Sequence, residues 1–149
     1  PPPPRETPES AVASGAAVEV PGGIVPALYR LAERFERETG VTVAVSAHDL
    51  PVMEREREVI LLRCTQEALA NIRKHANAGT VTLSATGRGS DVELRVEDDG
   101  VGFADAESTG GFGLAGMRER LALVDGSLDV HSSSSGTILT AHVPAVVPT

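Results

Sequence analysis

Polar side chains recur about one helical turn apart between residues 66 and 78. Glu67, Asn71 and Lys74 stand at i, i+4 and i+7, so on a helix they share one side, together with His75 and Ala78. An amide oxygen with a carboxylate one turn away suits Mg²⁺, and a lysine ammonium one turn further along suits a phosphate. A solvated helix face would look similar. Asn and His form helices less readily than Glu and Lys, however, and their use here favours a ligand-binding face.

An acidic residue stands directly before two glycines in the segment Asp98-Asp99-Gly100-Val101-Gly102. The two glycines permit backbone conformations closed to other residues and let a ligand approach closely. The carboxylate before them could accept a hydrogen bond, for instance from an adenine amino group. The same string is also typical of a simple turn, so this motif alone leaves both interpretations open.

Gly111, Gly113 and Gly116 spell Gly-x-Gly-x-x-Gly at the start of a helical pattern. A dinucleotide-binding fold requires a strand immediately before this motif, whereas here the polar segment 105–109 precedes it. A glycine-rich entry to a helix still offers N–H groups and a favourable dipole to a phosphate. A flexible loop before a helix is the alternative interpretation.

Helical and alternating patterns predict the elements that position these motifs. Apolar residues recur at helical spacing in 24–39, from 52 or 54 to 78, and in 114–125. Strands are expected at 41–45, 80–86, 91–97, 127–132 and 137–143, with residues 98–113 as an irregular loop. The last strand begins near Gly136-Thr137, where a hydroxyl could support a base site, although the pair alone is typical of a hairpin. Consecutive strands exclude a doubly wound parallel sheet and predict a two-layer α/β sandwich, a mixed sheet with helices on one face.

Length and composition limit the classes of protein. The 149 residues suit one domain, expected at 18–145, with a disordered linker at 1–17 and a short tail at 146–149. A net charge of −8 argues against a nucleic-acid binder, though not against a nucleotide. No signal peptide or long apolar run is apparent, which predicts a cytoplasmic, monomeric fragment without membrane contact. Cys64, the only cysteine, is expected to be buried and inert.

The order and spacing of these motifs resemble those of the DesK/NarL-like sensor histidine kinases. Residues 66–78 resemble their N-box, and the segment from Asp98 to Phe103 resembles the first glycine box. Residues 111–120 resemble the second glycine box, and Gly136-Thr137 the late Gly-Thr pair. The resemblance covers about residues 24–144 and implies the GHKL ATPase fold, also called the Bergerat fold.

The resemblance implies a role for each motif residue. Asn71 would contact Mg²⁺, and Lys74 would contact the phosphates of ATP. Asp98 would bind the adenine amino group, with support from Thr137. Glu67 matches a glutamate that activates water in some GHKL ATPases, and with Asn71 it forms the implied catalytic pair. The remaining implied cofactor-binding residues are His75, Gly100, Gly102, Gly111, Gly113 and Leu114.

Two positions depart from the pattern of the class. Phe112 stands where the class often has His, so a polar contact from the loop over the ATP is absent. Ala70 replaces a small polar residue, at a position that we expect to face away from the ligand. The loop between Phe103 and Gly111 is short, as in this class.

The function implied is transfer of the γ-phosphoryl group of ATP, with Mg²⁺, to a histidine on a separate dimerisation domain, and from there to a response regulator. The parent kinase can be anchored in a membrane. None of the four histidines matches the acceptor, so we expect no autophosphorylation of this fragment: His48, His75, His131 and His142. One alternative is a stand-alone anti-sigma-factor serine kinase of the same fold. Another is a degenerate regulatory domain, against which the intact Asn71 and Asp98 argue.

Overall fold

The computed structural model describes residues 22–101 and 113–147, except for the side chains of residues 75 and 76. The helical elements are α2 (Ile24–Thr39), α3 (Arg55–Asn71), the π-helical turn η1 (Ile72–Ala76) and α5 (Leu114–Ala122). The strands are β1 (Thr42–His48), β2 (Thr80–Arg88), β3 (Asp91–Asp98), β4 (Ser127–Ser133) and β5 (Gly136–Pro144). The predicted linker at 1–17 and most of the predicted loop at 98–113 lie outside the described residues, and the domain limits stay a prediction.

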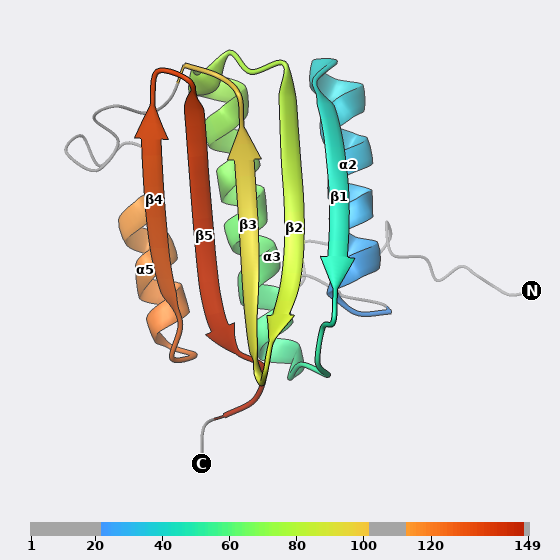
Figure 1. The fold of residues 1–149 in the computed structure, drawn as a ribbon, viewed down its shortest axis with the longest axis vertical. Coiled ribbons are helices and arrows are strands. Elements are labelled where there is room, and N and C mark those ends of the chain that lie inside the picture. Colours follow the sequence, from blue (N-terminus) through green and yellow to red (C-terminus); the bar gives the residue numbers. More distant parts are fainter. Residues whose placement is uncertain (1–21, 102–112, 148–149) are drawn as a thin grey trace, which may run out of the picture.

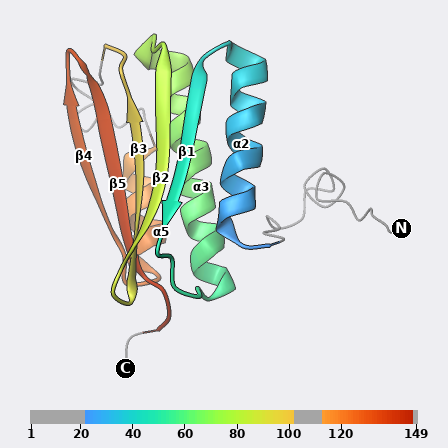
Figure 2. The same cartoon turned by 45° about the vertical axis from the view of Figure 1, so that its right-hand side comes forward.

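The five strands form one mixed sheet in the order β1-β2-β3-β5-β4. β1 and β2 are parallel. The chain leaves the end of β1, passes through α3 and η1, and so returns to the end of the sheet where β1 began before it enters β2. The other pairs are antiparallel, and β2–β3 and β4–β5 are hairpins. Figures 1 and 2 show α2, α3 and α5 against one face of this sheet. The predicted two-layer α/β sandwich is therefore confirmed.

Alternation of apolar and polar residues decides which face of the sheet is covered. In β2 every second side chain is buried, and in β3 the same holds, so the strands turn one apolar face toward the helices: Val81, Leu83, Ala85, Val92, Leu94 and Val96. α3 lies at the centre of the helical layer, in contact with α2, α5, β3 and β5. Cys64 on this helix is fully buried, and burial raises the pKa of its thiol to about 11, which confirms the predicted inert cysteine.

Two helices end differently from the prediction. The second helix was expected to run to residue 78, but the α-helix ends at Asn71, and the π-helical turn η1 follows. Asn77 then takes a positive φ of 52°, which stops the helix. The third helix was expected to run to residue 125 but ends at Ala122, because Asp125 takes a φ of 63° and turns the chain. Local backbone conformation, which periodicity does not report, causes both differences.

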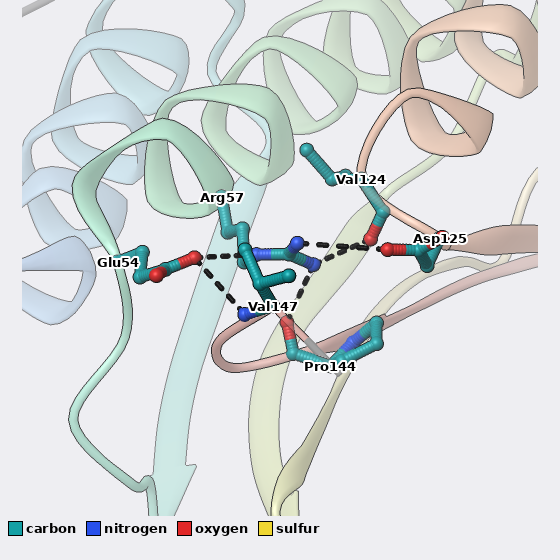
Figure 3. Close-up of polar contacts among 6 residues, drawn as sticks. All are labelled: Glu54, Arg57, Val124, Asp125, Pro144 and Val147. Atoms are coloured by element: carbon teal, nitrogen blue, oxygen red, sulfur yellow. Dashed lines mark hydrogen bonds and ion pairs between the residues drawn. The ribbon is translucent and has the colours of Figure 1, made fainter. Parts of the chain in front are cut away.

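Arg57 joins three elements at the end of the molecule where the chain leaves β5. The side chain is only 3% exposed, and its Nε donates to Glu54 Oε1 at 3.0 Å. Its Nη1 donates to the carbonyls of Val124 and Pro144, and its Nη2 lies 3.7 Å from Asp125 Oδ2 (Figure 3). We call this group, with the Val147 N–H that donates to Glu54, the arginine anchor. It fastens the start of α3 to the ends of α5 and β5.

Candidate functional site

Three of the motifs found in the sequence meet at the opposite end of the molecule from the arginine anchor. Asn71 is the last residue of α3, Asp98 the last residue of β3, and Thr137 the second residue of β5. Asp98 and Thr137 are paired directly in the β3–β5 ladder. The ends of α3 and β3 and the start of β5 lie together at the top of Figure 1. Residues far apart in the sequence thus lie at the same end of the sheet.

Asp98 is a buried carboxylate, with only 5% of the residue exposed. Its Oδ1 accepts a hydrogen bond of 2.8 Å from the backbone N–H of Gly100, two residues on. Burial raises the pKa of Asp98, the N–H groups of Gly100 and Thr137 oppose that rise, and the neighbouring Asp99 charge adds to it. A carboxylate removed from water in this way is a strong acceptor for a ligand that brings an N–H donor.

The backbone beside Asp98 is tight because residue 136 is a glycine. Gly136 has a φ of 137°, and a Cβ built on it would lie 2.1 Å from the Asp98 carbonyl oxygen. Only glycine lets β5 start so close to the end of β3. The next side chain, Thr137, is 3% exposed, and its Oγ1 lies 2.9 Å from Ser132 Oγ. The Gly-Thr pair therefore fixes a hydroxyl beside the Asp98 carboxylate.

The polar side of α3 is only partly a solvated face. Asn71 is buried, with 4% exposed, whereas Lys74 is exposed and Glu67 is half-buried. The interpretation as a plain solvated face is therefore wrong at Asn71. Ala70 lies instead in a groove between α2 and α3, on the side predicted to face away from the ligand. The π-helical turn changes the helical spacing after residue 71, so the predicted alignment of Lys74 with Asn71 does not follow from a regular helix.

Gly113 brings the start of α5 against the N-box. It is the N-cap of α5, with a φ of 71°, and a Cβ there would lie 2.8 Å from Glu67 Oε2. Leu114 is buried in the core, so only its backbone can face a ligand. The backbone N–H groups at this helix start, which have no partner within the helix, therefore lie near Glu67. Gly102, Gly111 and Phe112 lie outside the described residues, as does the His75 side chain.

The donor set fits a magnesium ion that phosphates help to hold. Among residues 22–101 and 113–147, no group of three or more His, Cys, Asp or Glu is placed to hold a metal. Asn71 offers one amide oxygen at the helix end, next to the π-helical turn. Mg²⁺ commonly takes one or two protein ligands and completes its shell with phosphate oxygens and water. The site suits a metal that arrives with a nucleotide better than a permanent protein-held ion.

Two residues important to the structure were not singled out in the sequence. Arg57 reads as one of several charges in a helix start, and its burial follows only from where α5 and β5 end. Asp99 reads as a loop residue of the glycine box, but its carboxylate accepts three hydrogen bonds from Gly79 and Thr80. An Asp after a strand is a common turn residue, so the sequence carries little signal for this contact.

Comparison with known proteins identifies the family of this chain. Residues 56–147, more than half of the chain, match the model of the histidine kinase-, DNA gyrase B- and HSP90-like ATPase family. The chain belongs to this ATPase family. No helix within the described residues is both long enough and apolar enough to cross a membrane.

Curated relatives are sensor kinases. The chain is 40% identical over 96 residues to the histidine-protein kinase/phosphatase UhpB of Salmonella typhimurium, covering 64% of this chain and 19% of the relative. It is 33% identical over 129 residues to DegS of Brevibacillus brevis, covering 82% of this chain and 32% of that protein. It is also 39% identical over 88 residues to the sensor histidine kinase DesK of Bacillus subtilis, covering 58% of this chain and 24% of that protein. The chain thus spans about a fifth to a third of these relatives.

Solved structures show the same fold. The histidine kinase domain of the blue-light-activated kinase EL346 of Erythrobacter litoralis superposes with a TM-score of 0.69 at 22% identity, over 83% of this chain and 65% of that chain. The mycobacterial sensor histidine kinase MprB gives a TM-score of 0.67 at 19% identity, over 85% of this chain and 97% of that chain. These likenesses support the GHKL ATPase fold.

Proposed function

We propose that this chain is the catalytic domain of a sensor histidine kinase, which binds ATP with Mg²⁺ and donates the γ-phosphoryl group to a histidine on a separate dimerisation domain. The observation that carries the proposal is the buried Asp98 carboxylate, paired with Thr137 at the edge where α3 ends in Asn71. Such an acceptor suits the amino group of adenine. A response regulator would receive the phosphoryl group later, and the site would work in the cytoplasm, where ATP is available.

The residues of the site divide the work between the two ends of ATP. Asp98, with Thr137 beside it, would hold the adenine. Asn71 would supply an oxygen ligand to Mg²⁺, and the exposed Lys74 would face the phosphates. The start of α5 at Gly113 would offer N–H groups to a phosphate. Phosphoryl transfer depends mainly on positioning and on charge stabilisation, which these groups provide without covalent chemistry on the chain.

The anti-sigma-factor serine kinase is the less favoured function. UhpB, DegS and DesK are named as histidine kinases, and the identities to this chain are 33–40%. In either kinase, Glu67 would help to position the start of α5, because it lies close to Gly113. It could also orient the group that attacks the γ-phosphate.

Isothermal calorimetry with a non-hydrolysable ATP analogue and Mg²⁺ tests the proposal. We expect saturable one-to-one binding that weakens when Mg²⁺ is removed, and much weaker binding of a GTP analogue. Radiolabelled ATP tests the second half of the proposal. The chain alone should acquire no acid-labile label, and adding the acceptor helices of the parent kinase should restore labelling, slowly in trans because a free partner has a low effective concentration. Absence of analogue binding would overturn the proposal.

A further inference from the structure

Asp99 makes a three-point contact just outside the pairing of β2 and β3. Its Oδ1 accepts hydrogen bonds from the backbone N–H groups of Gly79 at 2.8 Å and Thr80 at 3.0 Å. Its Oδ2 accepts a hydrogen bond of 2.9 Å from the Thr80 hydroxyl. The N–H and hydroxyl of Thr80, followed by the N–H of Gly79, lower the pKa of Asp99, so the carboxylate stays ionised at neutral pH.

The contact joins two segments that carry different halves of the nucleotide site. Gly79 and Thr80 follow the π-helical turn η1 after only two residues, and η1 follows Asn71 directly. Asp99 follows Asp98 directly. The carboxylate therefore ties the exit of the N-box to the first residue after the adenine-facing carboxylate.

Apart from the Asp99 side chain, backbone pairing at the starts of β1 and β2 holds this junction. The regular β2–β3 ladder ends at the pair Val81 and Asp98, so Gly79 lies beyond it. Two backbone hydrogen bonds of 3.3 Å continue the pairing, one from Asp99 N–H to the Thr80 carbonyl and one from Thr42 N–H on β1 to the Gly79 carbonyl. The turn η1 has no side-chain cap, and Asn77 has a positive φ of 52°. Among the described residues, the three hydrogen bonds to the Asp99 side chain add to these backbone bonds and join Gly79 and Thr80 to the segment after β3.

We propose that Asp99 is a positioning residue that sets the spacing between the phosphate half of the site, at Asn71 and Lys74, and the adenine half, at Asp98. The inference rests on the proposed function, since it needs one ligand to span both halves. Asp99 itself need not touch that ligand. ATP must contact both halves at once. Without the Asp99 contact, the junction would have to be ordered when ATP binds, and that entropic cost would weaken the affinity for ATP.

The test compares ATP with adenosine, which reaches only the adenine half. Asp99→Ala should raise the Kd of the ATP analogue with Mg²⁺ about tenfold, equivalent to ~1.4 kcal/mol. The Kd of adenosine, followed by NMR titration, should change less than twofold. Asp99→Asn should recover most of the ATP affinity, because the amide oxygen still accepts from the two N–H groups and the amide NH₂ can donate to Thr80.

Glu93→Ala is the matched control. Glu93 lies on β3, which Asp99 directly follows, and its Oε1 accepts a hydrogen bond from Arg88 at the far end of the same hairpin. The substitution removes a carboxylate that pairs within the hairpin, and it should leave both affinities unchanged. Equal affinities for the ATP analogue in wild type and Asp99→Ala would overturn the inference, and so would equal losses for ATP and adenosine. A wild type that binds no ATP analogue would overturn the proposed function and the inference together.

Discussion

The two ends of the domain each bury a charged side chain but use it differently. Arg57 at one end is 3% exposed, and Asp98 at the other is 5% exposed. The Arg57 guanidinium is satisfied by two carbonyls and two carboxylates from three elements. Within the described part of the chain, the Asp98 carboxylate accepts from the backbone N–H groups of Gly100 and Thr137, and burial raises its pKa. A buried charge that is saturated by its own chain stabilises the fold, whereas one that desolvation still disfavours is suited to a ligand.

Arg57→Met should cause the largest loss of stability. The substitution leaves the Val124 and Pro144 carbonyls without their donor and leaves the Glu54 carboxylate without its nearest cation. A buried carbonyl left without its donor typically costs about 1–3 kcal/mol of unfolding free energy. Urea denaturation measures it, with exposed Arg37→Met on α2 as the control. The folded fraction should bind the ATP analogue as well as the wild type. A loss under ~1 kcal/mol would show that the anchor is not structural.

Asp98→Asn should have the opposite profile. It should weaken binding of the ATP analogue by roughly tenfold to a hundredfold, because a hydrogen bond to a charged acceptor is worth about 1.5–3 kcal/mol. It should not destabilise the free domain, since it removes a charge that burial disfavours. Calorimetry and thermal unfolding on one preparation check both. Unchanged affinity would remove Asp98 from the site.

The raised pKa of Asp98 also predicts a pH dependence. The folded protein protonates Asp98 at a higher pH than the unfolded chain does. Asp98 therefore disfavours folding above its folded pKa, and this penalty is relieved as pH falls toward the unfolded pKa. Over the same range ATP affinity should fall, because the protonated carboxyl is a poorer acceptor. The Asp98→Asn variant should lose this part of the pH dependence, measured by titration from neutral pH down toward the ordinary Asp pKa of about 3.9. A parallel pH dependence in the variant would contradict the assignment.

Asn71→Ala should weaken binding of the ATP analogue about tenfold with Mg²⁺ and much less without it. A metal ligand predicts that difference, whereas a residue that only packs at the end of α3 predicts equal losses. Titrations with Mg²⁺ and with EDTA distinguish the two. Because Asn71 is buried, its Tm should be measured alongside.

Asp125→Asn should have the smallest effect, although Asp125 belongs to the arginine anchor. Its carboxylate is 59% exposed and lies 3.7 Å from the guanidinium. Exposed ion pairs contribute about 0–1 kcal/mol, so the loss should stay under ~0.5 kcal/mol and shrink in salt. Urea denaturation at two salt concentrations checks this. A loss near that of Arg57→Met would show that Asp125, and not the two carbonyls, is the main partner of Arg57.

The sequence predicted the layers of the fold and the residues of the site better than it predicted the contacts between the ends of helices and strands. The alternation in β2 and β3 and the spacing on α2 and α3 report burial, so they predict strands, helices and the shared face. Asp98 and Thr137 could be assigned to one site through the motif resemblance, and the ladder places them side by side. The π-helical turn after Asn71, the Asp99 contact and the arginine anchor depend on how chain ends meet in space. Contacts of this kind leave no periodic pattern in the sequence.

The most direct test of the central claim is an amide NMR titration of the whole chain with the ATP analogue and Mg²⁺. It observes both ends of the domain in one experiment. The account predicts the largest shifts at Asn71, Asp98, Gly100, Gly113 and Thr137, and near-zero shifts at Arg57, Val124 and Asp125. Large shifts at the arginine anchor with none around Asp98, or no shifts at saturating analogue, would contradict it.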